Sequence, residues 1–299
     1  MNSTVGTVAV GGREVNRIGL GMSPLARKVA GGGDREAAVA LLRRARELGV
    51  DYYDTARFYG GETANELLRE AFGDLDEVFV ATKVGARPVT GRFPMTAAQL
   101  PAELRREVEE NLRSLGTDRL DLVFLRRMDF LPGLVAEGEQ GEVSLADQLA
   151  ELVALREAGK IGAIGLSHVT TEQVRTGLDA GIAAVQNIDN LAYPQARELR
   201  ELCGREEIAW IPYFPLGGGA GVGQATGLTQ VRDLPAVREV AAELGATPTQ
   251  VGLAWHLAEN PTTVAITGTG SVEHLEENLA TDDLRLTAEQ KARLDAAAG

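Results

Sequence analysis

Short apolar runs alternate with longer amphipathic segments along most of this chain. Val50 to Gly60 (VDYYDTARFYG) begins as an apolar run and ends in a polar turn, and Val78 to Gly85 (VFVATKVG) repeats this order. A short apolar run bounded by turn signals is typical of a buried strand. The pattern predicts strands at 17–21, 50–53, 77–82, 121–125, 161–166, 184–187, 208–212 and 263–266.

The segments that follow these strands have the spacing of helices. In Arg35 to Leu48, apolar residues recur every three or four positions, Asp34 is a candidate N-cap, and Gly49 ends the pattern. Similar segments predict helices at 62–71, from about 101, and at 145–158, 171–179, 196–204, 235–244, 248–258 and 272–280. Residues 5–16 predict an opening hairpin around the Gly11-Gly12 turn.

About eight strands, each followed by a helix, predict a (β/α)8 TIM barrel with an N-terminal β-hairpin, in one domain over residues 1–299. The main alternative is a doubly wound sheet, which usually carries G-x-G-x-x-G in its first strand–helix turn. The sequence has no glycines at this spacing. The barrel is therefore the favoured fold.

Composition limits the classes of partner and the compartment. A formal net charge of −13 argues against nucleic acid and against anionic membrane surfaces. Cys203 is the only cysteine, which excludes an intramolecular disulfide and fits a reducing compartment. No apolar run reaches the roughly 18 residues of a membrane span, and MNSTVGTVAV does not read as a signal peptide. We expect a cytoplasmic protein, a monomer or small homo-oligomer, that binds a small molecule.

Polar residues stand where the apolar runs end, and these residues resemble a known family. Asp54-Thr55…Tyr59-Gly60 and Thr82-Lys83-Val84-Gly85 resemble the D-T-x-x-x-Y-G and T-K-x-G motifs of the aldo-keto reductases. Further matches follow in the family's order: GLS (165–167), VQN (185–187), PLG (215–217), TPTQVGLAW (247–255) and GTGSVEHLEEN (268–278). The resemblance covers nearly the whole chain and implies reduction of a carbonyl with hydride from a nicotinamide cofactor.

The same resemblance gives three residues their roles. A phenol with an unperturbed pKa of about 10 is a poor acid near neutrality. A nearby ammonium favours the ionised form and lowers that pKa. By resemblance Tyr59 donates the proton, Lys83 lowers the pKa of Tyr59, and Asp54 holds Lys83 charged and in place. Each residue alone would indicate an ordinary loop or helix-entry residue. Their register with the later motifs instead favours a catalytic role.

Arg126 departs from the family's pattern, because most members have His at this position. Arginine cannot shuttle a proton, but it can donate fixed hydrogen bonds to a carbonyl oxygen. The segments TKVGAR (82–87), LVFLRRM (122–128), PYFPLGG (212–218) and LGATPTQV (244–251) resemble bacterial members that reduce pyridoxal and carry Arg here. Pyridoxal has an oxygen anion beside its aldehyde, which a guanidinium could bridge. The alternative is that Arg126 is a core residue paired with Asp129.

The resemblance also implies the cofactor, NADP(H), and its contacts. Ser167 and Gln186 would hold the nicotinamide carboxamide, together with His168, where most members have Asn. Tyr213 would stack under the nicotinamide, and the loop from Leu216 to Gly223 would pass the pyrophosphate. The remaining expected cofactor residues are Gly21, Met22, Phe214, Gly217, Gly218, Thr269, Ser271, His274, Glu277 and Asn278. Gly268 and His274 stand where many relatives have Lys or Arg for a 2′-phosphate, yet NADP remains the expected cofactor.

The leading hypothesis is therefore NADPH-dependent reduction of pyridoxal. A reductase of another aldehyde, or of a sugar or polyketide ketone, is the alternative within enzymes. A nicotinamide-binding sensor or scaffold with little turnover is an alternative of another class, which intact Asp54, Tyr59 and Lys83 argue against. The three histidines and one cysteine show no metal-ligand spacing, so no metal is expected.

Overall fold

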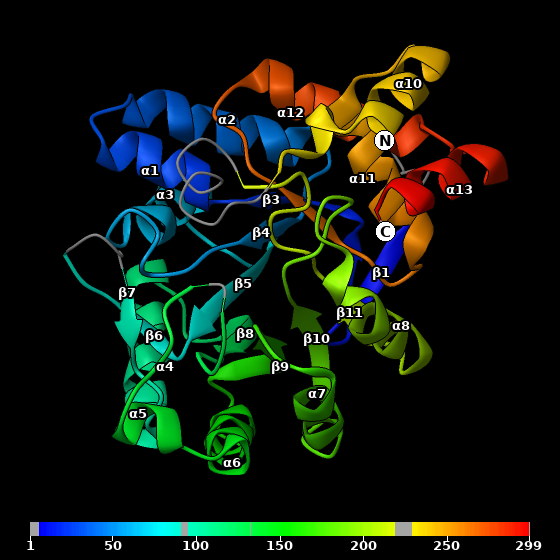
Figure 1. Ribbon diagram of the computed structural model, residues 1–299. Helices are drawn as coiled ribbons and strands as arrows, with labels where there is room; N and C mark the ends of the chain where they lie inside the picture. Colours follow the sequence, from blue (N-terminus) through cyan, green and yellow to red (C-terminus); the bar gives the residue numbers. More distant parts are fainter. Residues whose placement is uncertain (1–5, 91–94, 132, 219–228, 299) are drawn as a thin grey trace.

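Eight parallel strands curl into a barrel at the centre of the computed structural model (Figure 1), which describes residues 6–90, 95–131, 133–218 and 229–298. The strands are hydrogen-bonded in the order β11-β10-β9-β8-β5-β4-β3-β12. The ring closes between its first and last members, because the Trp210 N–H donates to Thr262 at 3.0 Å and the Val264 N–H donates to Trp210 at 2.9 Å. The predicted (β/α)8 barrel is confirmed.

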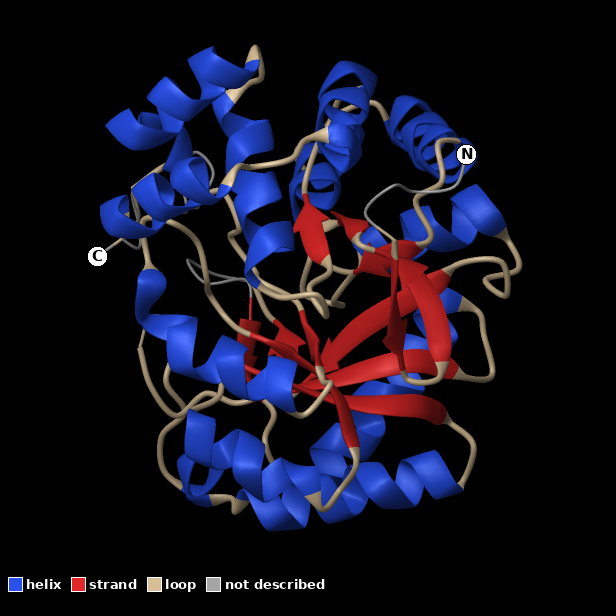
Figure 2. Cartoon of the chain, turned by 90° about the vertical axis from the view of Figure 1, so that its right-hand side faces the viewer, coloured by secondary structure: helices blue, strands red, loops and turns tan. Residues whose placement is uncertain are grey.

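The barrel strands are short, and helices surround them (Figure 2). The strands are β3 (Ile18–Gly21), β4 (Tyr52–Asp54), β5 (Phe79–Val84), β8 (Leu120–Arg126), β9 (Ile161–Ser167), β10 (Ile182–Gln186), β11 (Ala209–Trp210) and β12 (Ala265–Thr267). The α-helices are α1 (Ser23–Ala30), α2 (Arg35–Glu47), α3 (Thr63–Phe72), α4 (Pro101–Leu115), α5 (Glu139–Glu142), α6 (Leu145–Glu157), α7 (Thr171–Leu178), α8 (Arg197–Arg205), α10 (Pro235–Leu244), α11 (Pro248–Glu259), α12 (Val272–Leu279) and α13 (Ala288–Ala297). Short 3₁₀ turns are η1 (Pro194–Ala196), η2 (Val231–Asp233) and η3 (Ala280–Asp283).

Several helices, among them α2 and α11, begin at a side chain that satisfies one of their first free N–H groups. The Asp34 carboxylate accepts from the Ala37 N–H at 3.0 Å, so α2 begins where the sequence predicted. At α11 the Thr247 hydroxyl accepts from the Gln250 N–H at 3.2 Å, and the Gln250 side chain accepts from the Thr247 N–H at 3.0 Å. These caps fix the residues at which α2 and α11 begin.

The opening hairpin, β1 (Thr7–Val10) with β2 (Arg13–Asn16), covers the amino-terminal end of the barrel. Its turn residue Gly11 has φ +57°, and a Cβ there would lie 2.6 Å from the Cβ of Ala163, so only glycine fits. Arg13 donates to the Asp121 carboxylate at 3.1 Å and to the Val78 carbonyl at 3.3 Å. The hairpin prediction is confirmed, and the opposite, carboxyl-terminal end is left for chemistry.

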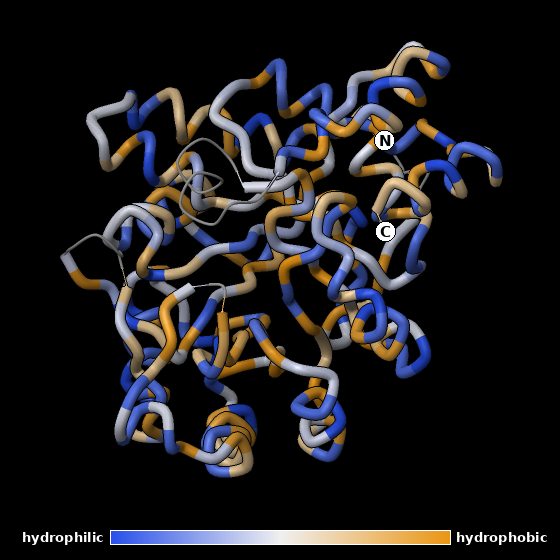
Figure 3. Tube along the Cα trace, viewed as in Figure 1, coloured by the Kyte–Doolittle hydropathy of each residue, from blue (hydrophilic) through white to orange (hydrophobic). Residues whose placement is uncertain are grey.

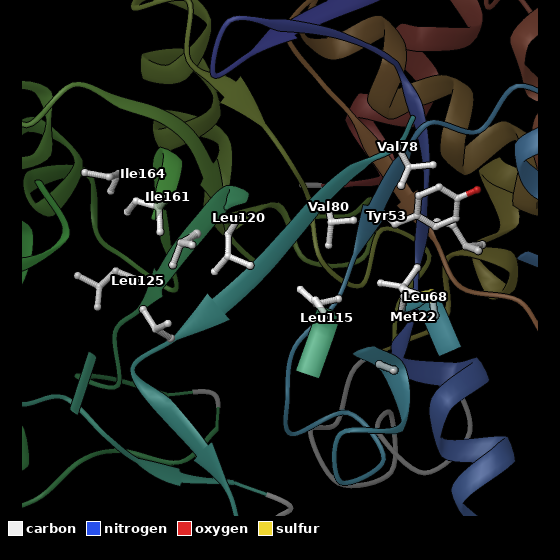
Figure 4. Packing of buried hydrophobic residues seen from close by; sticks show 14 of the residues in the cluster. Met22, Tyr53, Leu68, Val78, Val80, Leu115, Leu120, Leu125, Ile161 and Ile164 are labelled. Atoms are coloured by element: carbon white, nitrogen blue, oxygen red, sulfur yellow. The ribbon is translucent and has the colours of Figure 1, made fainter. Parts of the chain in front are cut away.

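Alternate residues of each barrel strand face inward and outward. On β4, Tyr52 points inward and stacks on Phe79 with ring centres 5.5 Å apart, while Tyr53 faces the surrounding helices. Figure 4 shows Tyr53 beside Val80 of β5 and Val78, which immediately precedes β5, in this outer layer. Figure 3 shows apolar segments concentrated along the strands and on the helix faces toward them. Because strand side chains alternate, Asp54 faces the same interior as Tyr52.

Some elements were not predicted from the sequence. They are α1, α5, α13 and a second hairpin, β6 (Ala86–Pro88) with β7 (Met95–Ala97). The first helix has Pro24 in its opening turn and no side-chain cap, so its sequence resembles a loop. Strand β11 is shorter than predicted, and residues 219–223 of the glycine-rich loop lie outside the described residues. Within the described ranges, no helix has the length and apolar character to cross a membrane.

Candidate active site

The strand register gathers polar side chains in one layer at the carboxyl end of the barrel. Asp54, Arg126, Ser167 and Gln186 are the last residues of β4, β8, β9 and β10. Ser167 pairs with both Arg126 and Gln186, and Asp54 pairs with Gly21 at the end of β3. Barrel enzymes place their active sites at this end. The fold therefore brings together residues that are up to 132 positions apart in the chain.

A buried ion pair lies at the centre of this layer. The Lys83 Nζ donates to Asp54 Oδ1 at 2.7 Å and to the Thr55 carbonyl at 3.0 Å, and both charged side chains are 3% exposed. The second Asp54 oxygen accepts from Gln186 Nε2 at 2.7 Å. Removing one partner of such a pair typically costs about 3–5 kcal/mol, because the other charge stays buried. Asp54 thus holds Lys83 in place, as expected, while the catalytic roles of both residues remain predictions.

Tyr59 lies above this pair on the loop between β4 and α3. The Lys83 Nζ is 5.1 Å from the centre of the Tyr59 ring. The loop is anchored by the buried Arg57, which donates to Glu107 at 2.9 Å and Glu110 at 3.0 Å and also pairs with Glu62. This anchoring fixes the position of the phenol relative to Lys83.

The pKa of Tyr59 differs from the sequence-based expectation. Burial raises the pKa of the phenol, and this effect outweighs the lowering by Lys83 and Arg126. The expected lowering by Lys83 has the right direction, but the prediction of a net lowered pKa is wrong, because the phenolate loses its hydration in the barrel mouth. Tyr59 is therefore protonated near neutrality and can act as an acid.

Two buried polar atoms beside the ion pair have no hydrogen-bond partner within the described part of the chain. They are Ser167 Oγ and Gln186 Oε1, on side chains that are 0% and 1% exposed. Leaving a buried polar atom unpaired typically costs about 1–3 kcal/mol. A primary amide group presents both a donor and an acceptor and would satisfy both atoms. This pair therefore fits a nicotinamide carboxamide.

His168 does not offer a ring nitrogen to such an amide. Its Nε2 lies 2.8 Å from the Phe130 carbonyl and its Nδ1 lies 3.0 Å from the Tyr213 hydroxyl. Its ring also stacks on Phe130, with ring centres 4.2 Å apart. Protein atoms therefore occupy both ring nitrogens, and the expected contact between His168 and the carboxamide stays a prediction.

Arg126 is held against Tyr213 rather than in an ion pair. The guanidinium carbon lies 5.8 Å from the Tyr213 ring centre, and the Arg126 Nε is buried with no partner among the residues described. Asp129 pairs with Arg127 at 2.8 Å, so the alternative of a pair between Arg126 and Asp129 is wrong. The charge of Arg126 helps to lower the pKa values of Tyr59 and Tyr213, although burial raises both overall.

Residues 17–298 of the chain match the Aldo/keto reductase family. The chain belongs to this family. It is accordingly an NAD(P)H-dependent oxidoreductase, as the motif resemblance implied.

Relatives of this reductase cover nearly its whole length. Pyridoxine 4-dehydrogenase of Escherichia coli K12 is 38% identical over 294 residues, which are 97% of each chain. An uncharacterized oxidoreductase of Schizosaccharomyces pombe is 34% identical over 300 residues, 98% of this chain and 90% of that one. The crystal structure of an aldo/keto reductase from Klebsiella pneumoniae in complex with NADP and acetate superposes with a TM-score of 0.77 at 26% identity, covering 99% and 95% of the chains.

The expected adenosine-side residues of this reductase gather around the start of α12. Ser271 is the N-cap, and its hydroxyl accepts from the His274 N–H at 3.2 Å. The Thr269 hydroxyl accepts from the Ser271 N–H at 3.1 Å. Glu277 accepts from the Thr247 hydroxyl at 2.6 Å, and Asn278 is buried. Glu277 is therefore tied to the start of α11, whereas His274 is exposed and available to a ligand.

A cation that the sequence did not reveal also lies here. Lys28 of α1 donates from Nζ to the Gly270 carbonyl at 3.1 Å and is otherwise exposed. It brings a positive charge to the segment in which Gly268 and His274 replace the basic residues of many relatives. No signal in the sequence pointed to Lys28, because α1 itself was not predicted.

The expected pyrophosphate-side residues have several structural roles. At Gly217 φ is +82° and a Cβ would lie 2.4 Å from the Thr229 carbonyl oxygen, so glycine is required by a chain crossing. Gly218 accepts from the Gln230 side chain, and Leu216 packs in a small apolar cluster with Leu253. Residues 219–223 of this loop lie outside the described residues.

Two expected residues beside the nicotinamide position also serve packing. The Met22 side chain is fully buried between barrel and helices, and its N–H donates to the Asp54 carbonyl at 2.9 Å. Phe214 lies edge-on to Tyr213, with ring centres 5.2 Å apart. Met22 thus fixes the end of β4 rather than presenting its side chain to the site.

A buried hydrogen-bond network supports the Lys83 strand, and the sequence did not reveal it. Thr82 on β5 donates to Asn111 of α4 at 2.7 Å, and Asn65 of α3 donates to the same oxygen at 3.1 Å. Asn65 in turn accepts from the Thr55 hydroxyl at 2.8 Å. Polar residues on otherwise apolar helix faces are the signal that could have found Asn65 and Asn111.

Proposed function

We propose that this aldo/keto reductase uses NADPH to reduce pyridoxal to pyridoxine, with the proton coming from Tyr59. The arrangement of Tyr59 over the buried pair of Lys83 and Asp54, beside the unpaired oxygens of Ser167 and Gln186, is the observation that carries the proposal. The name of the 38% identical relative, pyridoxine 4-dehydrogenase, supports the choice of substrate.

The residues present fit a nicotinamide cofactor. Ser167 and Gln186 would hold its carboxamide, and the ring of Tyr213 would lie against its nicotinamide face. When bound, the reduced cofactor supplies the hydride to the carbonyl carbon.

The protein supplies the proton and the positive charges. As the carbonyl oxygen gains negative charge, the Tyr59 O–H donates its proton to it, so the product is an alcohol. The phenolate that remains is stabilised by Lys83 and Arg126, the two groups that lower the pKa of Tyr59. Asp54 keeps Lys83 fixed during this exchange through the 2.7 Å ion pair.

Arg126 accounts for the choice of pyridoxal. Its guanidinium lies against Tyr213 with no carboxylate partner among the described residues, so its hydrogen-bond donors are available to a ligand. A guanidinium is a planar fork that suits two oxygens side by side. Pyridoxal offers such a pair in its aldehyde oxygen and the neighbouring ring oxygen. Donation to the aldehyde oxygen also stabilises the charge that develops there.

The preference for NADPH over NADH rests on charge at the adenosine side. Lys28, His274 and the Ser271 end of α12 lie together there, and a helix N-terminus favours anions by about 0.3–1 kcal/mol. The Klebsiella pneumoniae structure in complex with NADP supports the same choice.

NADPH oxidation with pyridoxal, followed in steady state, tests the proposal. Turnover that is lost in Tyr59→Phe, with NADPH still bound, would support it. Turnover of other aldehydes or of sugar or polyketide ketones, but not of pyridoxal, would show that one of these compounds, and not pyridoxal, is the substrate. A stable NADPH complex without turnover of any carbonyl would instead favour a sensor or scaffold.

A further inference from the structure

His168 joins three loops at the carboxyl end of the barrel. Its ring stacks on Phe130 of the loop after β8, and its Nε2 lies 2.8 Å from the carbonyl of the same residue. Its Nδ1 lies 3.0 Å from the hydroxyl of Tyr213, in the loop after β11. The backbone of His168 has φ +58°, an unusual value for a residue other than glycine. The ring is thus held by contacts at both nitrogens and by stacking on Phe130.

The chemistry of these partners fixes the direction of each hydrogen bond. A carbonyl can only accept, so His168 Nε2 carries the hydrogen that bonds Phe130. Burial and then the Arg126 charge lower the pKa of His168, so the ring is neutral near pH 7 and its Nδ1 is an acceptor. The Tyr213 hydroxyl therefore donates its hydrogen to Nδ1.

This direction has a consequence for Arg126. Because the Tyr213 hydroxyl donates its only hydrogen to His168, its oxygen can only accept hydrogen bonds from its other neighbours. The Arg126 guanidinium is one of these neighbours, and its carbon lies 5.8 Å from the centre of the Tyr213 ring. The Arg126 guanidinium thus lies against a ring whose hydroxyl is fixed by a hydrogen-bond chain that runs from Tyr213 through His168 to the Phe130 carbonyl.

We propose that His168 is a positioning residue that acts through the Tyr213 hydroxyl to hold the Arg126 guanidinium toward the substrate. In this protein, His168 contacts Tyr213 and, through Tyr213, supports Arg126. It would do so in place of the carboxamide contact that relatives make from this position. The effect of His168 on carbonyl reduction rests on the proposed function. The hydrogen bonds from His168 to Tyr213 and Phe130 do not depend on it. A protonated His168 would break the chain, because its Nδ1 could no longer accept from Tyr213.

Three substitutions separate the two ring nitrogens. His168→Asn keeps a polar atom near the Nδ1 position, His168→Gln keeps one near Nε2, and Tyr213→Phe removes only the hydroxyl. We expect His168→Gln and Tyr213→Phe each to lower kcat/KM for pyridoxal by about tenfold, and His168→Asn to retain most of it. The double variant H168Q/Y213F should be no worse than either single variant, because both remove the same link.

NADPH affinity distinguishes this role from a cofactor contact. Dissociation constants measured by NADPH fluorescence should stay within about twofold of wild type in all the variants. A marked loss of NADPH affinity in His168→Gln, with losses in kcat/KM that add to those of Tyr213→Phe, would overturn the proposal. Circular dichroism and thermal melts would show whether each variant keeps the wild-type fold.

A spectroscopic measurement tests the chain without any turnover. The protein has three histidines, so long-range ¹H–¹⁵N spectra can be assigned to His168 with the His168→Asn variant. We expect the neutral ring to carry its hydrogen on Nε2, and its Nδ1 resonance to move in Tyr213→Phe. A hydrogen on Nδ1, or an Nδ1 chemical shift that is unchanged in Tyr213→Phe, would overturn the proposal. If the wild-type protein shows the expected spectrum but turns over no carbonyl, the proposed function is wrong, and the hydrogen bonds of His168 with Tyr213 and Phe130 are still supported.

Discussion

At the scale of single residues, two opposing effects set the protonation of Tyr59. Burial raises its pKa, and the charges of Lys83 and Arg126 lower it by less. The acid form is therefore kept well into the alkaline range, and the lysine is needed mainly to stabilise the phenolate once the proton has left. A positive charge at Arg126 adds to this stabilisation and, unlike histidine, does not titrate near neutrality.

The pH dependence of turnover follows from these two groups. Because the acid form of Tyr59 is required and its pKa is raised, kcat for reduction should be flat from pH 5 to 8 and fall only at high pH. In Arg126→His, a group with an unperturbed pKa of about 6.5 should add an inflection on the acid side. The measurement is kcat against pH with an aldehyde that does not titrate in this window. An inflection near pH 6.5 in wild type that disappears in Arg126→His would contradict this assignment.

The fork of Arg126 gives a second prediction at this scale. Arg126→His should lower kcat/KM for pyridoxal more than for benzaldehyde, because only pyridoxal offers a second oxygen beside its aldehyde. We expect the difference between the two substrates to reach about tenfold, the effect of one charge-assisted hydrogen bond of roughly 1.5 kcal/mol. Equal losses for both substrates would rule out bridging.

At the scale of elements, α1 brings Lys28 to the start of α12. Lys28→Ala should weaken NADPH binding about fivefold, roughly 1 kcal/mol for an exposed charge, and leave NADH binding unchanged. Arg27→Ala is the matched control, because Arg27 is an exposed cation one position earlier on the same helix. Fluorescence titrations of both cofactors provide the comparison. Equal effects of the two substitutions would exclude a specific role for Lys28.

The ends of the barrel strands could be predicted from the sequence, and the contacts made by helices could not. Asp54 and Gln186 end short apolar runs and Lys83 lies near the end of another, so their meeting at one edge follows from the fold class. Lys28 and Asn111 lie on helices, and their partners depend on how those helices pack in three dimensions. For the same reason, the sequence could not show that Tyr213 and Phe130 would occupy both ring nitrogens of His168.

At the scale of the whole molecule, buried neutral histidines link stability to pH. His256 is fully enclosed, its Nε2 lies 3.0 Å from the Pro215 carbonyl, and burial lowers its pKa. A lowered folded-state pKa gives a contribution to stability that is complete above the unfolded value of about 6.5 and is lost as pH falls toward the folded value. His168 adds to the same trend.

A comparison of melting temperatures tests this linkage. Between pH 7.5 and 5.5, the melting temperature of His256→Gln should fall less than that of wild type, because glutamine gains no proton in the unfolded chain. The other ionisable groups, which give the protein a formal net charge of −13, change the melting temperature of both proteins alike. The difference between the two changes in melting temperature therefore reports on His256. The same fall in both proteins would show that His256 does not contribute.

The role of Tyr59 as the proton donor is the central claim, and Tyr59→Phe tests it most directly. Single-turnover oxidation of bound NADPH by pyridoxal should slow by roughly 10²-fold or more, because the acid is removed while the ring remains. The NADPH dissociation constant should be unchanged, and Tyr193→Phe, a matched change at a partly exposed tyrosine with no predicted role, should react at the wild-type rate. An unchanged single-turnover rate in Tyr59→Phe would contradict the account.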